Sequence, residues 1–158
     1  MKNISIKESK QLSKLYLNKV YPLDQRKFLR LHTQHVVEIA KILGTYKKAN
    51  LKTLEVAGWV HDIGYVANTE HHAIYTVGIL KKKFNLDKEL LDCILNHGNK
   101  GTPTTREGKI FQIADKLSIL RPEIVKLILE TTNGKTRKSD FDFLEMMTTK
   151  AIDLFRSY

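Results

Sequence analysis

The chain has 158 residues, a formal net charge of +10 and one cysteine. This length fits one domain, residues 1–158, with a substantial hydrophobic core. All apolar runs are shorter than the roughly 18 residues of a membrane span, and the N-terminus lacks the apolar segment of a secretory signal. We therefore expect a cytoplasmic protein with no membrane partner. The positive charge favours an anionic partner, such as a nucleotide, another phosphoester or nucleic acid.

Apolar residues recur at helical spacing along the whole chain. The predicted helices cover residues 6–20, 24–44, 50–62, 69–80, 88–97, 104–117, 122–131 and 139–157. No segment alternates between polar and apolar residues for long enough to predict a strand. We therefore predict an all-α protein, a single globular domain of seven or eight helices. Cys93, in an apolar part of the fifth helix, is predicted to be a small buried side chain.

Particular residue types mark the expected ends of these helices. The predicted N-caps are Asp24, Asn50, Thr69, Asp87, Thr104 and either Ser139 or Asp140. Thr104 and Glu107 have the spacing of a capping box. Residues that break, turn or start a helix explain other boundaries, and these are Pro22, Gly64, Pro122 and the turn Asn133-Gly134.

A histidine and an aspartate stand side by side where the third predicted helix ends, at His61-Asp62. Imidazole and carboxylate groups are typical ligands of divalent metals. Adjacent side chains leave a helix about 100° apart, so an ion held by both lies across the helix end and needs ligands from other helices. His32 and Asp115 supply the same ligand types from the second and sixth helices. We therefore predict a metal held by these four residues.

Two further histidines favour a second metal. An ion about 3.5 to 4 Å from the first, with Asp62 as a bridge, would take His72 and His97 as its other ligands. Asp115 follows Ile113 and Ala114, so its carboxylate is predicted to face the interior, where it needs a cation to offset desolvation. The sequence leaves open whether the two histidines hold a second ion or contact a phosphate beside a single one.

The order of these residues resembles a known family. The local matches are Leu31-His32-Thr33 with Val36 and Ala40, residues 57–64 around the doublet, and residues 113–118. Over residues 28–121 the chain is similar to the HD superfamily of metal-dependent phosphohydrolases, and His72 and His97 resemble ligands of its six-ligand, two-metal branch. Its size and Ala114-Asp115 with Arg121 are similar to the bacterial hydrolases that split diadenosine tetraphosphate symmetrically. The loop at residues 102–105 differs from them, and the helices at 6–20 and 122–157 lie outside the resemblance.

The resemblance implies the HD-domain fold and hydrolysis of a phosphoester or phosphoanhydride bond in a nucleotide-like small molecule by a metal-activated water. Asp62 is then a catalytic residue as well as a metal ligand. Lys116 and Arg121, with Lys100 or Arg106, are candidates to orient substrate phosphates. The ligand types suit iron, manganese, nickel or cobalt and are compatible with magnesium, so they do not identify the ion.

Several assignments have alternatives. His35 lies one turn from His32, and we interpret it as a supporting or surface residue rather than a ligand. His71 competes with His72, and the apolar spacing that follows favours His72. His97 alternatively interacts only with the dipole at the end of its helix.

The basic residues and the tryptophan also have structural interpretations. Lys116 and Arg121 alternatively form exposed salt bridges. Trp59 is predicted to belong to the core rather than to a substrate platform.

Two other functions stay open. The same six-ligand arrangement resembles that of di-iron oxygenases in the HD superfamily, which cleave C–C or C–P bonds with dioxygen. The positive charge also suits a metal-binding regulatory or nucleic-acid-binding module. An oxygenase needs iron and dioxygen, a hydrolase works with manganese in their absence, and a module binds nucleic acid without turnover. The substrate and the oligomeric state are not determined by the sequence.

Overall fold

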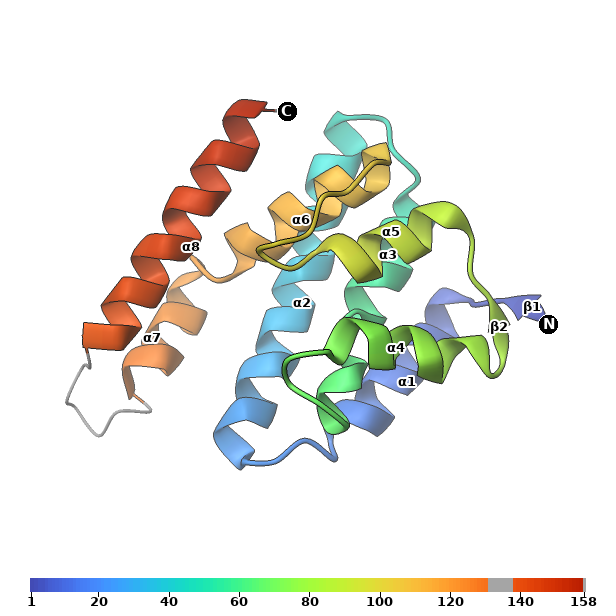
Figure 1. Ribbon diagram of the computed structural model, residues 1–158, viewed down its shortest axis with the longest axis horizontal. Coiled ribbons are helices and arrows are strands. Elements are labelled where there is room, and N and C mark those ends of the chain that lie inside the picture. The colour runs from blue at the N-terminus through green and yellow to red at the C-terminus, as the bar shows by residue number, and fades with distance from the viewer. Residues whose placement is uncertain (131–137, 158) are drawn as a thin grey trace.

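Two crossing helices form the centre of the molecule, which we describe from a computed structural model covering residues 1–130 and 138–157 (Figure 1). They are α2 (Leu23–Tyr46) and α6 (Arg106–Ser118). The other helices in the described residues are α1 (Ile6–Leu17), α3 (Leu51–Val60), the short 3-10 helix η1 (Ile63–Val66), α4 (His72–Lys81), α5 (Lys88–Asn96), α7 (Pro122–Glu130) and α8 (Lys138–Ser157). The predicted all-α architecture is confirmed.

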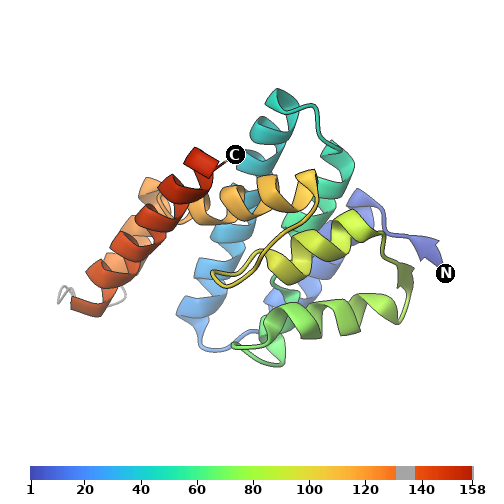
Figure 2. The same cartoon turned by 45° about the horizontal axis from the view of Figure 1, so that its top comes forward.

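The remaining helices pack on opposite sides of this central pair. Helix α3 packs on α2, α5 packs on α6, and α1 and α4 cover the outer side of α3, η1 and α5. Helices α7 and α8 lie on the other side, where α7 contacts α2 and α8 contacts α6 (Figures 1 and 2). The last two helices therefore form a separate wall beside the central pair.

The main hydrophobic core lies between α2, α3, α5 and α6. Its fully buried members include Val36, Ala40, Leu54, Ala57, Val60, Ile94, Phe111 and Ala114. Cys93 is also completely buried, as predicted, and Trp59 packs against this core. A smaller cluster of Ile119, Ile124 and Met147 joins the end of α6 to α7 and α8.

Three predicted helix starts are confirmed. The side chain of Asn50 accepts a hydrogen bond from the amide of Thr53, and that of Asp87 accepts one from the amide of Leu90. Pro122 is the first residue of α7. In these places a local side-chain bond, or the preset proline backbone, is sufficient to begin the helix.

Three other predicted starts and one predicted end are wrong. Helix α2 begins at Leu23 after Pro22, so Asp24 lies inside its first turn, and α4 begins at His72 rather than at Thr69. Helix α8 begins at Lys138, before both Ser139 and Asp140. Helix α2 also continues past Gly44 to Tyr46. The predicted turn Asn133-Gly134 lies outside the described residues.

The predicted capping box is also wrong. Thr105, not Thr104, caps α6 by accepting a hydrogen bond from the amide of Gly108. The Glu107 carboxylate accepts a hydrogen bond of 3.0 Å from the amide of Asn50 at the start of α3. A tertiary contact between two helix starts therefore replaces the local bond that the spacing predicts.

One small sheet was not predicted. Strands β1 (Lys2–Asn3) and β2 (Phe84–Asn85) pair in parallel. Two-residue strands are too short to show any alternation, so only the pairing of distant segments reveals them. Within the described ranges, no helix has the length and apolar character needed to cross a membrane.

The loop between α5 and α6 is held by two polar side chains. The Asp92 carboxylate accepts hydrogen bonds from the amides of Thr104 (2.9 Å) and Thr105 (2.7 Å) and from the Thr105 hydroxyl (2.6 Å). Gln112 Nε2 donates to the carbonyls of Asn96, Gly98 and Gly101 at 2.9 to 3.1 Å. The loop is therefore fixed from α5 at one end and from α6 along its length.

Replacing the Asp92 carboxylate tests this anchor. Burial would raise the pKa of Asp92, but hydrogen bonds from Thr105 and its neighbours lower it below the usual value of 3.8. Because the pKa is lower in the folded state, the stabilisation is present above the unfolded pKa of about 3.9 and is lost as the pH falls through the folded value. Asp92→Asn is expected to lower the free energy of unfolding by about 1.5–3 kcal/mol at pH 7.

Urea unfolding at pH 7 and at successively lower pH measures this difference, which should narrow in acid. Asp153→Asn, at an exposed position of α8, is the matched control and should change little. A difference that stays constant below pH ~3 would contradict the charged anchor.

Candidate metal centre

Four predicted ligand residues meet between α2, the end of α3 and α6. The Nε2 atoms of His32 and His61 lie 3.3 Å apart. Asp115 Oδ1 lies 3.1 Å from His32 Nε2 and 3.7 Å from His61 Nε2. Asp62 Oδ2 lies 3.2 Å from His61 Nε2 and 3.6 Å from His32 Nε2. Two imidazole nitrogens and two carboxylate oxygens therefore surround one point.

A second group of ligand atoms lies on the other side of Asp62. The Nε2 atoms of His72 and His97 lie 3.0 Å apart, and Asp62 Oδ1 lies 3.4 Å and 3.6 Å from them. The two oxygens of one carboxylate thus face two different histidine pairs. All six predicted ligand residues are brought together, and His32, His61, Asp62, His97 and Asp115 are buried.

Three of the histidines sit at helix ends and are oriented in the same way. His61 and His97 are the C-cap residues of α3 and α5, and His72 is the first residue of α4. In each, Nδ1 lies 2.7 to 2.9 Å from the carbonyl oxygen three residues earlier, which belongs to Gly58, Ile94 or Thr69. A carbonyl accepts a hydrogen bond from Nδ1–H, so each Nε2 carries a free lone pair directed at the centre.

His32 needs a different partner because it lies in the middle of α2, where helical bonds already use the carbonyls. Ser118 Oγ lies 2.7 Å from His32 Nδ1 and donates its own proton to the carbonyl of Asp115 at 2.7 Å. The serine oxygen therefore accepts from Nδ1, and the lone pair of His32 Nε2 also faces the centre. Sequence reasoning assigned Ser118 no role.

This donor set fits divalent cations. With protons on Nδ1, the Nε2 lone pairs of His32 and His61 face each other at about 3 Å, and so do those of His72 and His97. Two facing lone pairs repel each other, and a cation bound by both removes this repulsion. Burial lowers the pKa of His72, which keeps it neutral as a ligand requires. Groups suited to metal ions occur within this set as His32–His61–Asp62, His61–His97–Asp115 and Asp62–His72–His97.

The charges of the site also favour a cation. Burial would raise the pKa of Asp62, but the His61 imidazole outweighs burial and holds it well below its usual range. Burial likewise opposes ionisation of Asp115, whose pKa is kept low by the Lys116 ammonium, 2.6 Å from Asp115 Oδ2. Asp62 and Asp115 in turn raise the pKa of His61 against the effect of burial. When all four imidazoles are neutral, as metal ligands must be, two carboxylates and one ammonium leave the buried site with one excess negative charge, which a bound cation compensates.

Thr76 and Gly64 hold α4 against the His61-Asp62 doublet. The buried Thr76 hydroxyl donates to the carbonyl of His61 and accepts from the amide of Gly64, both at 2.9 Å. A side chain at position 64 would collide with the backbone of His72 and Thr76. Glycine is therefore required here by the close approach of α4, which carries His72 into the site.

A cavity of about 220 Å³ opens from the ligands towards α8. Its other lining side chains are Phe28, Tyr65, Asn99, Lys116, Ile119, Phe143 and Met147. The Phe28 ring stacks on His32 and the Tyr65 ring on His72, with centroids 5.6 Å and 4.2 Å apart. Burial raises the pKa of Tyr65, so its phenol stays protonated and can donate a hydrogen bond into the cavity.

The other predicted site residues lie as follows. Lys116 is buried and lines the cavity, so its exposed salt-bridge alternative is wrong. Arg121 does form a surface salt bridge, with Nη2 2.9 Å from Glu38 Oε2. His35 faces Glu38 and Glu123 at 3.7 Å and 3.8 Å instead of the ligand cluster. His71 is exposed and caps α4, which leaves His72 in the cluster.

Comparison with known families agrees with this arrangement. A family model described as HD domain matches residues 30–120, which contain all six ligand residues. The chain belongs to the HD domain family. No solved structure matches the chain.

Several known proteins are similar to part of the chain. A deoxyguanosinetriphosphate triphosphohydrolase-like protein of Caldanaerobacter subterraneus is 30% identical over 113 residues, which cover 59% of this chain and 33% of that protein. Ribonuclease Y of Ureaplasma parvum is 32% identical, with 58% and 20% covered, and that of Treponema denticola is 34% identical, with 58% and 18% covered. The chain thus matches a third or less of the length of these relatives.

The role of Ser118 can be tested through metal affinity. Ser118→Ala removes the acceptor for His32 Nδ1, so the ring loses its orientation, and Mn²⁺ affinity is expected to fall about 10- to 100-fold. Isothermal titration of metal-free protein with Mn²⁺ measures the change. Thr33→Val is the control, because the buried Thr33 hydroxyl lies beside His32 without a hydrogen-bond partner among the described residues. Equal affinities of Ser118→Ala and wild type would show that the serine does not position the ligand.

Proposed function

We propose that this HD-domain protein is a two-metal phosphohydrolase that cleaves a phosphoester or phosphoanhydride bond in a nucleotide-like small molecule. One observation carries the proposal: Asp62 presents Oδ2 to His32 and His61, and Oδ1 to His72 and His97. A carboxylate between two such histidine pairs suits a bridge between two ions. Asp115 completes the first position.

Divalent ions held by these residues would supply a nucleophile from water at neutral pH and would stabilise negative charge on phosphoryl oxygens. Protein groups orient the imidazole ligands and shield the cavity before substrate binds. The four Nδ1 contacts fix the imidazole rings, so no reorientation is needed when substrate binds. Phe28, Ile119 and Met147 shield one side of the cavity from water, which strengthens electrostatic interactions inside it.

Lys116 and Tyr65 are the proposed phosphate-orienting groups. Lys116 lines the cavity with its ammonium 2.6 Å from Asp115, so it holds this carboxylate ionised and adds positive charge beside the metal positions. The protonated Tyr65 phenol is a hydrogen-bond donor in the same cavity. Arg121 is engaged by Glu38, and we do not assign it to the site.

The relatives support the class of reaction. A triphosphohydrolase-like protein and ribonuclease Y are by name hydrolases of phosphorus–oxygen bonds in a nucleotide and in RNA. A small phosphorylated molecule is the proposed substrate here because the cavity beside the ligands is only about 220 Å³.

Metal content and hydrolysis test the proposal together. We expect about two metal ions per chain by elemental analysis, and Mn²⁺-dependent product release from an aryl phosphodiester or a dinucleoside polyphosphate under anaerobic conditions. Two irons with dioxygen uptake and no hydrolysis would instead indicate an oxygenase. No metal and no hydrolysis, with salt-dependent binding of nucleic acid, would indicate a binding module.

Removing the Asp62 carboxylate should eliminate both metal binding and hydrolysis. Asp62→Ala is expected to lose most bound metal and to reduce kcat/KM about 100-fold or more, because loss of a single electrostatic group at a reaction centre commonly has this effect. His35→Ala, one turn from His32 and turned towards Glu123, is the control and should retain metal and turnover. Metal loss in the His35 variant would refute the ligand assignment in α2.

A further inference from the structure

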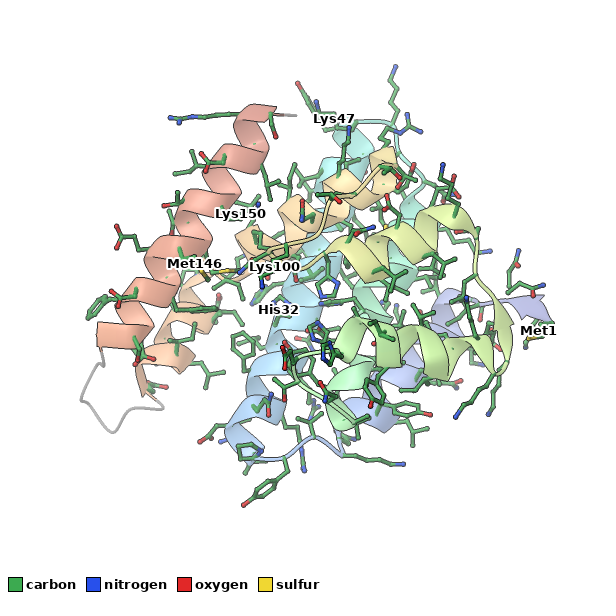
Figure 3. All side chains as sticks on the ribbon, viewed as in Figure 1. Met1, His32, Lys47, Lys100, Met146 and Lys150 are labelled. Carbon is green, nitrogen blue, oxygen red and sulfur yellow. The ribbon has the colours of Figure 1, made fainter. Side chains whose placement is uncertain are left out.

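A second cavity follows the metal-centre cavity beneath α8, and together we call them the α8 groove. The second cavity has a volume of about 410 Å³. The loop at residues 101–103, Lys109 and Gln112 of α6, and Lys150 and Ser157 of α8 line it. In Figure 3, Lys150 lies on the side of α8 that faces α6 and this loop.

Helix α8, helix α6 and the loop between α5 and α6 each contribute residues to both cavities. On α8, Phe143 and Met147 line the first, and Lys150, Leu154 and Ser157 line the second. This spacing places them on one face of the helix. On α6, Lys116 faces the first cavity and Lys109 and Gln112 the second, while the loop contributes residues 98–99 and then 101–103. The two cavities are therefore successive parts of one groove that begins at the metal ligands.

The second cavity contains two lysines from different helices. None of the described residues that line it is acidic. Lys150 also borders Glu145 and Asp153 on the outer side of α8, but no described carboxylate lies within 4.0 Å of its ammonium or that of Lys109. Two ammonium groups at one cavity, neither of them in a salt bridge with a described carboxylate, attract an anion.

We propose that Lys109 and Lys150 form a second anion subsite, which binds a phosphate of the substrate distal to the phosphate at the metal centre. Lys150 lies one turn along α8 from Met147, about 4.5 Å, and Lys109 lies two turns along α6 from Lys116, about 10.5 Å. Both lysines therefore lie beyond the residues of their own helix that line the first cavity. The inference rests on the proposed function and extends its substrate class to molecules with several phosphates, either a dinucleoside polyphosphate or a short oligonucleotide.

The test compares extended substrates with one that has a single phosphate. We measure kcat/KM for a dinucleoside tetraphosphate, a tetradeoxynucleotide and an aryl phosphodiester in Mn²⁺. In Lys109→Ala/Lys150→Ala, the kcat/KM of an extended substrate relative to that of the aryl ester is expected to fall about tenfold or more. The substrate that shows this fall identifies the source of the distal phosphate. Equal changes for all three substrates would overturn the subsite.

The matched control is Lys14→Ala/Lys82→Ala, which also removes two exposed positive charges. Lys14 lies in α1, and Lys82 follows α4. Both helices lie across α2 from α8 (Figure 1). The ratio of kcat/KM values should stay at its wild-type value in this variant, and an equal fall there would show a nonspecific effect of net charge and overturn the subsite.

A binding measurement separates this inference from the proposed function. If the wild type hydrolyses none of the substrates, the proposed function fails. Fluorescence anisotropy with a labelled tetradeoxynucleotide then still tests the subsite. For single strands each phosphate contact contributes about 0.7 to the slope of log affinity against log salt, so the double variant, which loses one phosphate contact, should lose about 0.7 from this slope. An unchanged slope would refute the subsite.

Discussion

Two carboxylates and four imidazoles share one small, largely buried space, and the rest of the structure depends on this constraint. Their Nε2 lone pairs and carboxylate oxygens converge within 3.0 to 3.7 Å. Such a set is costly to desolvate unless cations or protons compensate it. Lys116 supplies part of this compensation through Asp115. The remaining negative charge and the directed lone pairs make the centre a receptor for divalent ions.

Helix ends position three of the four imidazoles. Carbonyls three residues before His61, His72 and His97 accept from Nδ1 because they lie where helical bonding begins or stops. Thr76 and the absence of a side chain at Gly64 bring α4 onto the doublet, while Asp92 and Gln112 fix the loop that follows His97. Each ligand is thereby held by a contact outside the metal positions, as precise metal geometry requires.

The family match and the α8 residues that line the two cavities belong to different parts of the chain. The HD-domain match ends at residue 120 and includes every proposed ligand. Helix α8 lies beyond it, yet its residues close the metal-centre cavity and line the second cavity. The proposed hydrolytic chemistry therefore rests on residues inside the family match. The proposed selection among phosphorylated substrates rests on the wall that α8 adds.

The sequence by itself determined the helical class and most helix positions, and it singled out the six His and Asp residues that the structure brings together. Apolar periodicity, the doublet His61-Asp62 and caps such as Asn50 and Asp87 are patterns within a few residues, so they can be recognised in the sequence. Only the tertiary structure decided that Glu107 bonds Asn50, that Ser118 orients His32 and that Lys116 is buried while Arg121 pairs with Glu38. These contacts join segments far apart in sequence or depend on which helix face is covered. Local spacing and residue type do not specify these contacts, because the contacts follow from how α2, α6 and α8 pack.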